Sequence, residues 1–236
     1  MSDKGDVVVE RLHRLLDLAA ELRDTATAKP DVEAARERLR AWQAVRLART
    51  HADLLASPNM GPAATFFLTD IYGSSDLSKL AGDVKRIVPV MTKFLPTAGL
   101  ETVADAIELH ALSEQLDLAM VKALGKKIGT LDASAYGNAY RKVDRRADRE
   151  RQIALIDDLG HALARLIGQP FVSSGLSLMR MPARLAGYGG LQSFLERGHD
   201  AFRKIGDTKE FLDLVVSRER KLLSALFAGD DSLLGQ

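Results

Sequence analysis

Three of the five histidines follow an acidic residue by three positions, a spacing that is able to bind a metal ion. The pairs are Glu10 with His13, Asp158 with His161, and Glu196 with His199. Carboxylate-bridged di-iron and di-manganese bundles combine two Glu-x-x-His pairs with two further glutamates from neighbouring helices. The candidate ligands for such a site are Asp158, His161, Glu196, His199, Glu108 and Glu114. With iron or manganese as cofactor, this pattern indicates an oxidative or hydrolytic enzyme.

Three details of the sequence weaken the metal interpretation. One pair begins with an aspartate, and the order along the chain would be acid, acid, pair, pair rather than alternating. His199 also follows Gly198 on a segment rich in charge. Acidic residues and histidines at this spacing commonly form solvated charge pairs on a helix surface. A metal-dependent helical enzyme is therefore the alternative, and we lean toward a protein without catalytic activity.

A polar strip interrupts a largely apolar stretch in the middle of the chain. His110, Glu114 and Asp117 are spaced at i, i+4 and i+7, so they project from one face of a helix. They could form an acid–base pair, bind a metal, or line the polar floor of a ligand pocket. They could instead form a ladder of ion pairs with arginines on a neighbouring helix. We favour the ladder and keep the three residues as ligand-binding candidates.

The most distinctive local sequence is FFLTDIYG, at 66–73. Its two phenyl rings predict an anchor in the core, and Asp70 and Tyr72 bring polar atoms to the edge of that core, where they need partners. Asp70 could be a ligand or an acid in a site, but we favour a buried capping or ion-paired carboxylate. Both polar residues remain ligand-binding candidates.

The octapeptide and the segment ELHALSE, at 108–114, together carry a family resemblance. The chain resembles an uncharacterised family of bacterial helical proteins marked by FFLxDxYG followed by an ELxALSE-like segment. The resemblance extends over most of the chain. It implies a shared all-helical fold and transfers no activity to this protein.

Another candidate site lies between 171 and 184, where hydroxyl residues precede two arginines. Amide groups at a helix start, together with Arg180 and Arg184, could hold an anion or a carboxylate. The simpler interpretation is a capped helix whose methionines fill gaps in the core and whose arginines pair with carboxylates, for example those of the central helix. A further possibility is a pocket for an apolar ligand formed by Phe66, Phe67, Met179 and Met181.

The segment from 141 to 151 contains six basic and three acidic residues. The interleaved acids neutralise many potential contacts with phosphate, and no aromatic residue accompanies the arginines for base stacking. We therefore do not expect nucleic-acid binding. A solvated face or a contact with a partner protein is the interpretation that we favour for this segment.

Composition restricts the class of protein. The chain of 236 residues contains 33 Lys plus Arg and 32 Asp plus Glu, so any charge-driven partner must meet a local patch. It contains no cysteine, which excludes disulfides, a thiolate nucleophile and cysteine-ligated metal. No apolar run approaches the roughly 18 residues of a membrane span, and the polar start is unlike a secretory signal. We expect a cytoplasmic protein without a membrane span.

The candidate site residues must lie on helices, because apolar residues recur at helical spacing along most of the chain. The pattern predicts a hairpin over 6–57 with its turn before Pro30, a central helix from Thr97 to about Lys127, and one helix over 132–168 kinked near Gly137. We expect an all-α, multi-helix bundle of about eight helices. It forms a single domain over 1–236, in which the hairpin packs on a helical core over 61–229.

The leading functional hypothesis is a non-catalytic binding or regulatory module. It engages a protein partner, or a small ligand, between its helices, and self-association is one form of it. The hypothesis follows from weak net charge, abundant helix faces and the lack of a recognisable motif such as GxSxG or GxxxxGK[ST]. No cofactor is expected under it.

Overall fold

The computed structural model describes residues 3–72, 77–94 and 97–235, and these ranges are predominantly helical, with no strand among them. The eleven α-helices are α1 Asp3–Thr27, α2 Pro30–Thr50, α3 Ala52–Ala56, α4 Gly61–Phe66, α5 Leu77–Phe94, α6 Thr97–Leu124, α7 Ala133–Val143, α8 Arg146–Ile167, α9 Pro170–Leu185, α10 Gly189–Phe202 and α11 Thr208–Phe227. A π-helix, η1 Phe67–Tyr72, and two 3-10 helices, η2 Gly125–Thr130 and η3 Ser232–Leu234, complete the described elements. The all-α prediction is confirmed. None of the helices in these ranges combines the length and the apolar character of a membrane-spanning segment.

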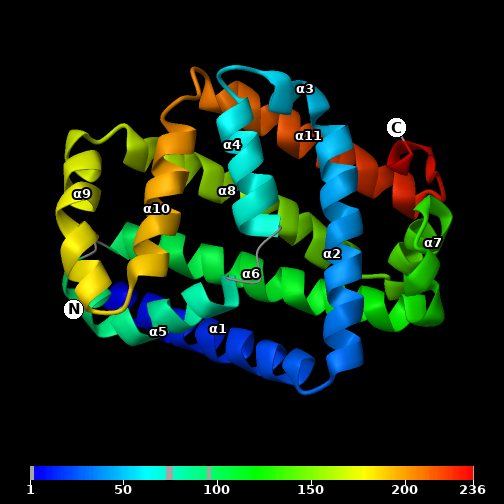
Figure 1. The fold of residues 1–236 in the computed structure, drawn as a ribbon, viewed down its shortest axis with the longest axis horizontal. Helices are drawn as coiled ribbons and strands as arrows, with labels where there is room; N and C mark the ends of the chain where they lie inside the picture. The colour runs from blue at the N-terminus through cyan, green and yellow to red at the C-terminus, as the bar shows by residue number, and fades with distance from the viewer. Residues whose placement is uncertain (1–2, 73–76, 95–96, 236) are drawn as a thin grey trace.

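The predicted N-terminal hairpin is formed by α1 and α2. Pro30 lies in the first turn of α2, where its missing donor costs nothing, and Asp31 and Glu33 lie near the positive end of the helix. The two helices diverge from their turn: α1 lies along α6, whereas α2 crosses α6 (Figure 1). Both arms of the hairpin therefore pack on the central helix.

The centre of the fold is α6, which has apolar side chains on several sides. Near its start, Ala104 and Ile107 pack against α1 and α5. In its middle, Leu116 packs against Leu155 of α8. Near its end, Met120 packs in a cluster shared with α2, α7 and α11. The helix thus joins most layers of the molecule, and its polar residues must find partners on its neighbours.

The segment from 132 to 168 forms two helices, not the single kinked helix that we expected. The break is at Asp144, whose backbone adopts the left-handed conformation (φ 51°) between α7 and α8. Gly137 lies inside α7, where a Cβ atom would come within 1.9 Å of Asp231 Oδ1. Arg141, one turn later, donates to the same carboxylate at 2.7 Å. The glycine therefore makes room for the C-terminal segment instead of producing a kink.

The octapeptide FFLTDIYG spans the end of α4 and the π-helix η1. Phe66 is 6% exposed, and its ring centre lies 5.3 Å from that of Phe194 on α10. Phe67 contacts Phe202 and Phe211 through ring contacts in the same cluster. The two rings anchor the segment between α4, α10 and α11. Gly73 lies outside the described residues.

The hairpin of α9 and α10 lies at one end of the molecule (Figure 1). The main packing partner of α9 is α10, with a smaller contact to α8. None of the described side chains of α9 is buried: Val172, Leu176 and Ala183 are half-buried, and the others are exposed. This helix therefore presents most of its surface to solvent.

Candidate functional site

The polar strip of α6 faces arginines of α2. Both carboxylate oxygens of Glu114 accept hydrogen bonds, Oε2 from Arg36 and Oε1 from Arg40, and Glu114 and Arg36 are each 3% exposed. Asp117 accepts from Arg40 Nε at 3.2 Å and from Gln43 Nε2 at 3.3 Å. Charge-assisted bonds of this kind satisfy buried carboxylates inside the protein. The Glu114 carboxylate is therefore already occupied.

His110 precedes Glu114 by one turn but has no comparable partner. Its Nε2 atom is buried and forms no hydrogen bond with the described residues. Burial, reinforced by the positive charges of Arg40 and Arg36, lowers the pKa of His110 from 6.5 to about 4. The imidazole is therefore neutral near pH 7 and adds no charge to the ladder.

The carboxylates at the other end of α6 bind arginines of α1 and α8. Glu108 accepts from Arg11 of α1 and, at 2.7 Å, from Arg151 of α8. Asp105 also accepts from Arg11, at 2.7 Å. Arg151, and after it Arg11, holds the pKa of Glu108 below its usual value against the opposing effect of burial. Carboxylates along α6 thus tie three neighbouring helices to it.

The metal alternative gains no geometric support. Among the described residues, no three His, Cys, Asp or Glu side chains are grouped so that they could hold a metal ion. His161 Nδ1 lies 3.1 Å from the Asp157 carboxylate on its own helix, and Asp158 is exposed. Three of the candidate acids accept hydrogen bonds from arginines, namely Glu108, Glu114 and Glu196. The six candidate ligands do not converge.

Asp70 is paired with Arg197 of α10. Arg197 Nε and Nη2 lie 2.8 and 2.6 Å from Asp70 Oδ1, and the aspartate side chain is 17% exposed. This pair links η1 to α10, which is the geometry of an ion-paired structural carboxylate. The side chain of Tyr72, the other polar candidate of the octapeptide, lies outside the described residues.

The arginine-rich segment at 141–151 is largely engaged by contacts within the fold. Arg149 is 8% exposed, and its guanidinium carbon lies 4.8 Å from the centre of the Tyr140 ring. The ion pairs of this segment are Arg141 with Asp231, Arg145 with Asp148, Arg146 with Glu150, and Arg151 with Glu108. These contacts provide no support for a phosphate-binding surface.

Three polar contacts fasten α9 to α10. Arg180 Nε donates to Glu196 at 2.8 Å, and Gln192 Nε2 donates to the carbonyl of Leu176 at 2.7 Å. The third is a hydrogen bond of 2.9 Å between Ser173 Oγ, at the start of α9, and His199 Nε2 of α10. Arg180, and after it Gln192, holds the pKa of Glu196 below its usual value. Arg180 therefore pairs with α10 and not with the central helix.

Ser173, His199 and Asp200 form a constellation that the sequence pattern did not reveal. His199 Nε2 lies 2.9 Å from Ser173 Oγ, and His199 Nδ1 lies 3.3 Å from Asp200 Oδ1. This order resembles a nucleophile, its base and an orienting acid. The Asp200 side chain is 69% exposed. Catalysis would also require an oxyanion hole and a substrate cavity beside Ser173, so the three residues alone assign no reaction.

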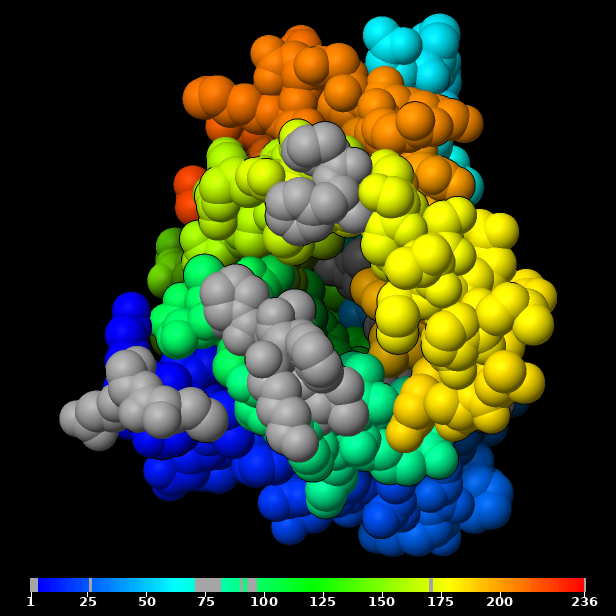
Figure 2. All heavy atoms as spheres, turned by 90° about the vertical axis from the view of Figure 1, so that its left-hand side faces the viewer, coloured from blue at the N-terminus to red at the C-terminus, as the bar shows by residue number. Residues whose placement is uncertain are grey.

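The outer side of α9 carries an exposed apolar stripe. Leu178, Met181 and Leu185 are 80%, 62% and 83% exposed, and their spacing of i, i+3 and i+7 places them on one side of the helix. In Figure 2, α9 and its turn into α10, in yellow, form an outer corner of the molecule. We call these three residues the α9 face.

Exposure of the methionines corrects two interpretations of this segment. Met179 and Met181 are 53% and 62% exposed, so they do not fill gaps in the core. The phenyl rings of the octapeptide lie in a core cluster that contains neither methionine. The physical reason is that α9 is apolar on two sides, and only the side of Leu176 and Ala183 meets another described helix.

Positive charge borders the α9 face. From residue 159 to residue 195, the sequence contains three arginines and no Asp, Glu or Lys. Arg184 is exposed and forms no ion pair with a described residue. On a helix with 3.6 residues per turn, its side chain projects about 60° from that of Met181. Arg180 lies one turn earlier on the same border, so the apolar stripe has a basic edge.

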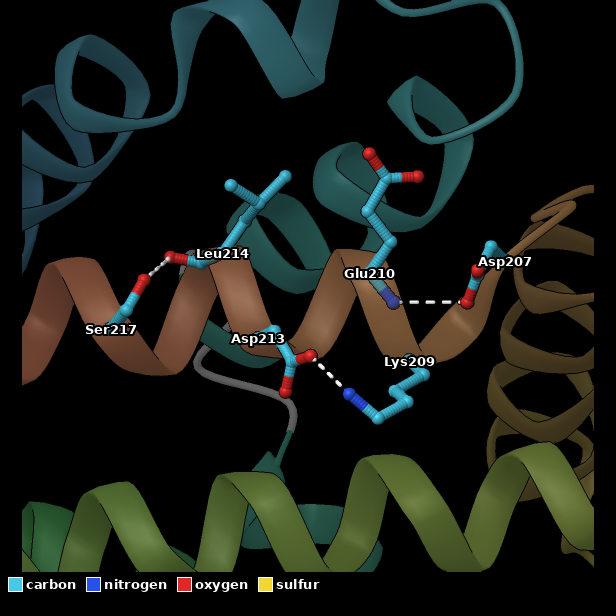
Figure 3. Close-up of a pocket in the computed structure, with 6 residues that line it drawn as sticks. All are labelled: Asp207, Lys209, Glu210, Asp213, Leu214 and Ser217. Carbon is cyan, nitrogen blue, oxygen red and sulfur yellow. Dashed lines mark hydrogen bonds and ion pairs between the residues drawn. The ribbon is translucent and has the colours of Figure 1, made fainter.

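A shallow depression of about 410 Å³ lies along the first half of α11. Its lining residues are Asp207, Lys209, Glu210, Asp213, Leu214 and Ser217. Figure 3 shows that they come from α11 and the residue that caps its start, Asp207. Several bind one another: Lys209 binds Asp213 at 2.6 Å, and Asp207 accepts from the Glu210 amide at 3.0 Å. Groups from several elements do not converge here, as they would in a ligand pocket.

Comparison with known proteins gives one match at the level of a family. No curated protein and no solved structure matches the sequence. The family described as "Domain of unknown function (DUF8198)" matches residues 22–233, a range that includes α2 to α11 and both segments that carry the sequence resemblance. The chain therefore belongs to the family of the domain of unknown function DUF8198.

Proposed function

We propose that this protein is a non-catalytic helical module that binds a partner protein through the α9 face. One observation carries the proposal: Leu178, Met181 and Leu185 are 80%, 62% and 83% exposed on one side of one helix. Single exposed leucines are ordinary, but a contiguous apolar patch on a folded protein often marks an interaction surface. Methionine in such a patch adapts its shape to the partner.

The ion pairs between α6 and α2 favour a binding function over a catalytic one. The cluster around Glu114 and Arg36 is closed by its own ion pairs and has no open carboxylate at its centre. The outer side of α9, by contrast, meets no other described helix. Covering apolar surface gains about 25 cal/mol per Å², so a partner that covers the α9 face gains free energy that this chain leaves unused.

The proposed setting is the cytoplasm of a bacterium. A chain without cysteine is suited to a reducing compartment. The sequence resemblance described above is to bacterial helical proteins.

Quantitative co-purification tests the proposal. Tagged wild-type protein and the variant Leu178→Glu/Leu185→Glu are isolated from cells that produce the protein naturally, and co-purifying proteins are compared by mass spectrometry. Val45→Glu is the matched control, because Val45 is 51% exposed on α2. We expect a partner that is retained by wild type and control and is reduced about tenfold or more by the double variant, because central apolar contacts dominate binding free energy.

Circular dichroism and thermal unfolding show whether the variants fold as the wild type does. We expect that they do, because both leucines are exposed in the folded protein. If the double variant retains the same proteins in the same amounts as the wild type, the α9 face is not the binding surface and the proposal is wrong.

A further inference from the structure

We propose further that the occupant of the α9 face is an amphipathic helix of the partner, with acidic residues beside its apolar stripe. The inference rests on the proposed function, because it specifies the chemistry of the partner at the same face. Two features of α9 support it, namely the shape of its apolar stripe and the sign of the charge along its edge.

The shape of the α9 face matches one stripe of a second helix. Leu178 and Leu185 are separated by about 10 Å of helix axis, which is two turns at a rise of 1.5 Å per residue. A helix with apolar residues at i, i+3 or i+4, and i+7 presents a stripe of the same length. Gly175 lies about one turn before Leu178 on α9. A Cβ atom built on this glycine would meet nothing within 4 Å. The backbone of a partner helix therefore has room to approach α9 there.

Charge specifies which residues border the stripe of the partner. Arg184 is exposed beside Met181 and Leu185 and forms no ion pair with a described residue. Arg180, on the same border, already shares its charge with Glu196. The sequence contains no acidic residue from 159 to 195. Glu196 of α10, whose pKa the charge of Arg184 helps to lower, is hydrogen-bonded to Arg180 and Gln192 and forms no ion pair with Arg184. An acidic residue beside the partner's stripe would pair with Arg184 and fix the orientation of the helix.

The same charges disfavour the two other apolar occupants. A second copy related by a two-fold axis perpendicular to α9 would run the two helices antiparallel with their basic borders on the same side. Arg184 of both copies would then meet, while the Glu196 of each copy is already paired with Arg180. Stable attachment to an anionic membrane needs a polar face rich in Lys and Arg, whereas α9 has two arginines and one of them is paired. An acidic helix satisfies both the apolar stripe and its basic edge.

The probe for this inference is a displayed library of random peptides of roughly 16 residues, the length of a helix that spans α9. The library is selected on the full-length wild-type protein and counter-selected on Leu178→Glu/Leu185→Glu. Enriched peptides are synthesised and measured on the wild type, on Arg184→Glu and on the control Arg220→Glu, whose arginine is exposed on α11. Parallel arms measure self-association by light scattering and co-sedimentation with phosphatidylcholine vesicles that contain phosphatidylglycerol.

We expect the enriched peptides to combine the helical apolar spacing with flanking Asp or Glu. Their affinity should fall about tenfold on Arg184→Glu, as for a partly shielded ion pair at an interface edge, and should be unchanged on Arg220→Glu. Peptides that need the two leucines but lack acids would overturn the acidic helix and leave the proposed function standing. If no peptide discriminates the wild type from the double variant, and neither self-association nor vesicle binding depends on the two leucines, both proposals fail. Leucine-dependent dimers or vesicle binding in place of peptide binding would overturn the acidic helix in favour of a second copy or a membrane.

Discussion

Glu114 and Arg36 form the most deeply buried ion pair among the described residues. Glu114→Gln keeps the volume of the side chain but removes the charge that Arg36 and Arg40 share. Breaking one side of a buried pair leaves an uncompensated charge, so we expect the free energy of unfolding to fall by about 3 kcal/mol. Glu37→Gln, on the exposed side of α2, should change it by less than about 0.5 kcal/mol.

Urea denaturation of both variants measures this difference. Equal midpoints for Glu114→Gln and Glu37→Gln would contradict the account of the ladder, because they would mean that the pairs of α6 with α2 contribute no more than a surface charge.

His110 makes stability depend on pH in a defined window. In the unfolded chain the imidazole gains a proton below about pH 6.5, whereas in the folded protein its pKa is about 4. Because the unfolded state binds more protons between these values, stability falls as the pH drops from about 6.5 to about 4, by up to about 3 kcal/mol. His110→Phe removes this titration and the unsatisfied Nε2 atom.

The measurement is the free energy of unfolding of wild type and His110→Phe at several pH values. We expect the two proteins to diverge in favour of the variant as the pH falls through this window. A constant difference from pH 7 to pH 4 would show that His110 titrates alike in the folded and unfolded states. His110→Gln serves as the second variant if phenylalanine packs poorly.

Residue-scale prediction from the sequence succeeded where spacing alone determines geometry. The i, i+4, i+7 positions of His110, Glu114 and Asp117 do lie along one side of α6, where the ladder hypothesis looked for arginines. The partners could not be named, because α2 carries several arginines and only packing decides which of them face α6. The sequence also could not predict that His110 is buried without a hydrogen-bond partner, since that depends on how the whole chain packs.

At the scale of elements, the apolar pattern predicted the helices but not which apolar side of a helix is buried and which is exposed. The two stripes of α9, one through Leu176 and Ala183 and one through Leu178, Met181 and Leu185, are both visible in the sequence. Sequence reasoning assigned the methionines to the core, because an apolar helix face is usually buried in its own chain. The sequence carries no signal that separates the two stripes, because both are apolar and the segment from 159 to 195 contains only three charged residues.

Two glycines in different surroundings should respond differently when each is replaced by alanine. Gly160 of α8 lies against α11, and a Cβ atom there would come within 2.2 Å of Leu212, which is fully buried and has no room to move. Gly160→Ala should therefore lower the free energy of unfolding by about 1 to 3 kcal/mol. Gly175→Ala, in the open surface of α9, should leave it unchanged or raise it by up to about 1 kcal/mol.

Chemical denaturation of both glycine variants checks this pair. Destabilisation by Gly175→Ala as large as that by Gly160→Ala would contradict the description of α9 as an exposed helix. Tolerance of Gly160→Ala would contradict the close packing of α8 on α11.

At the scale of the whole molecule, α6 gathers the other helices while α9 stays at the edge. Ion pairs join α6 to α1, α2 and α8, and its apolar sides pack into three separate clusters. At one end of the molecule, α10 packs on the octapeptide rings and α11, whereas α9 is fastened to α10 largely by a few polar contacts. A closely packed centre and an exposed apolar edge would suit the module that we propose, which presents one helix to a partner.

The most direct test of the α9 face is photocrosslinking in the cells that produce the protein. The crosslinking amino acid p-benzoyl-L-phenylalanine replaces Met181, 62% exposed on α9, or Val45, 51% exposed on α2, and adducts are identified by mass spectrometry after irradiation. We expect an adduct from position 181 to an amphipathic segment bearing acidic residues in one partner protein, and no such adduct from position 45. An absence of adducts at 181, or the same adducts from both positions, would contradict it.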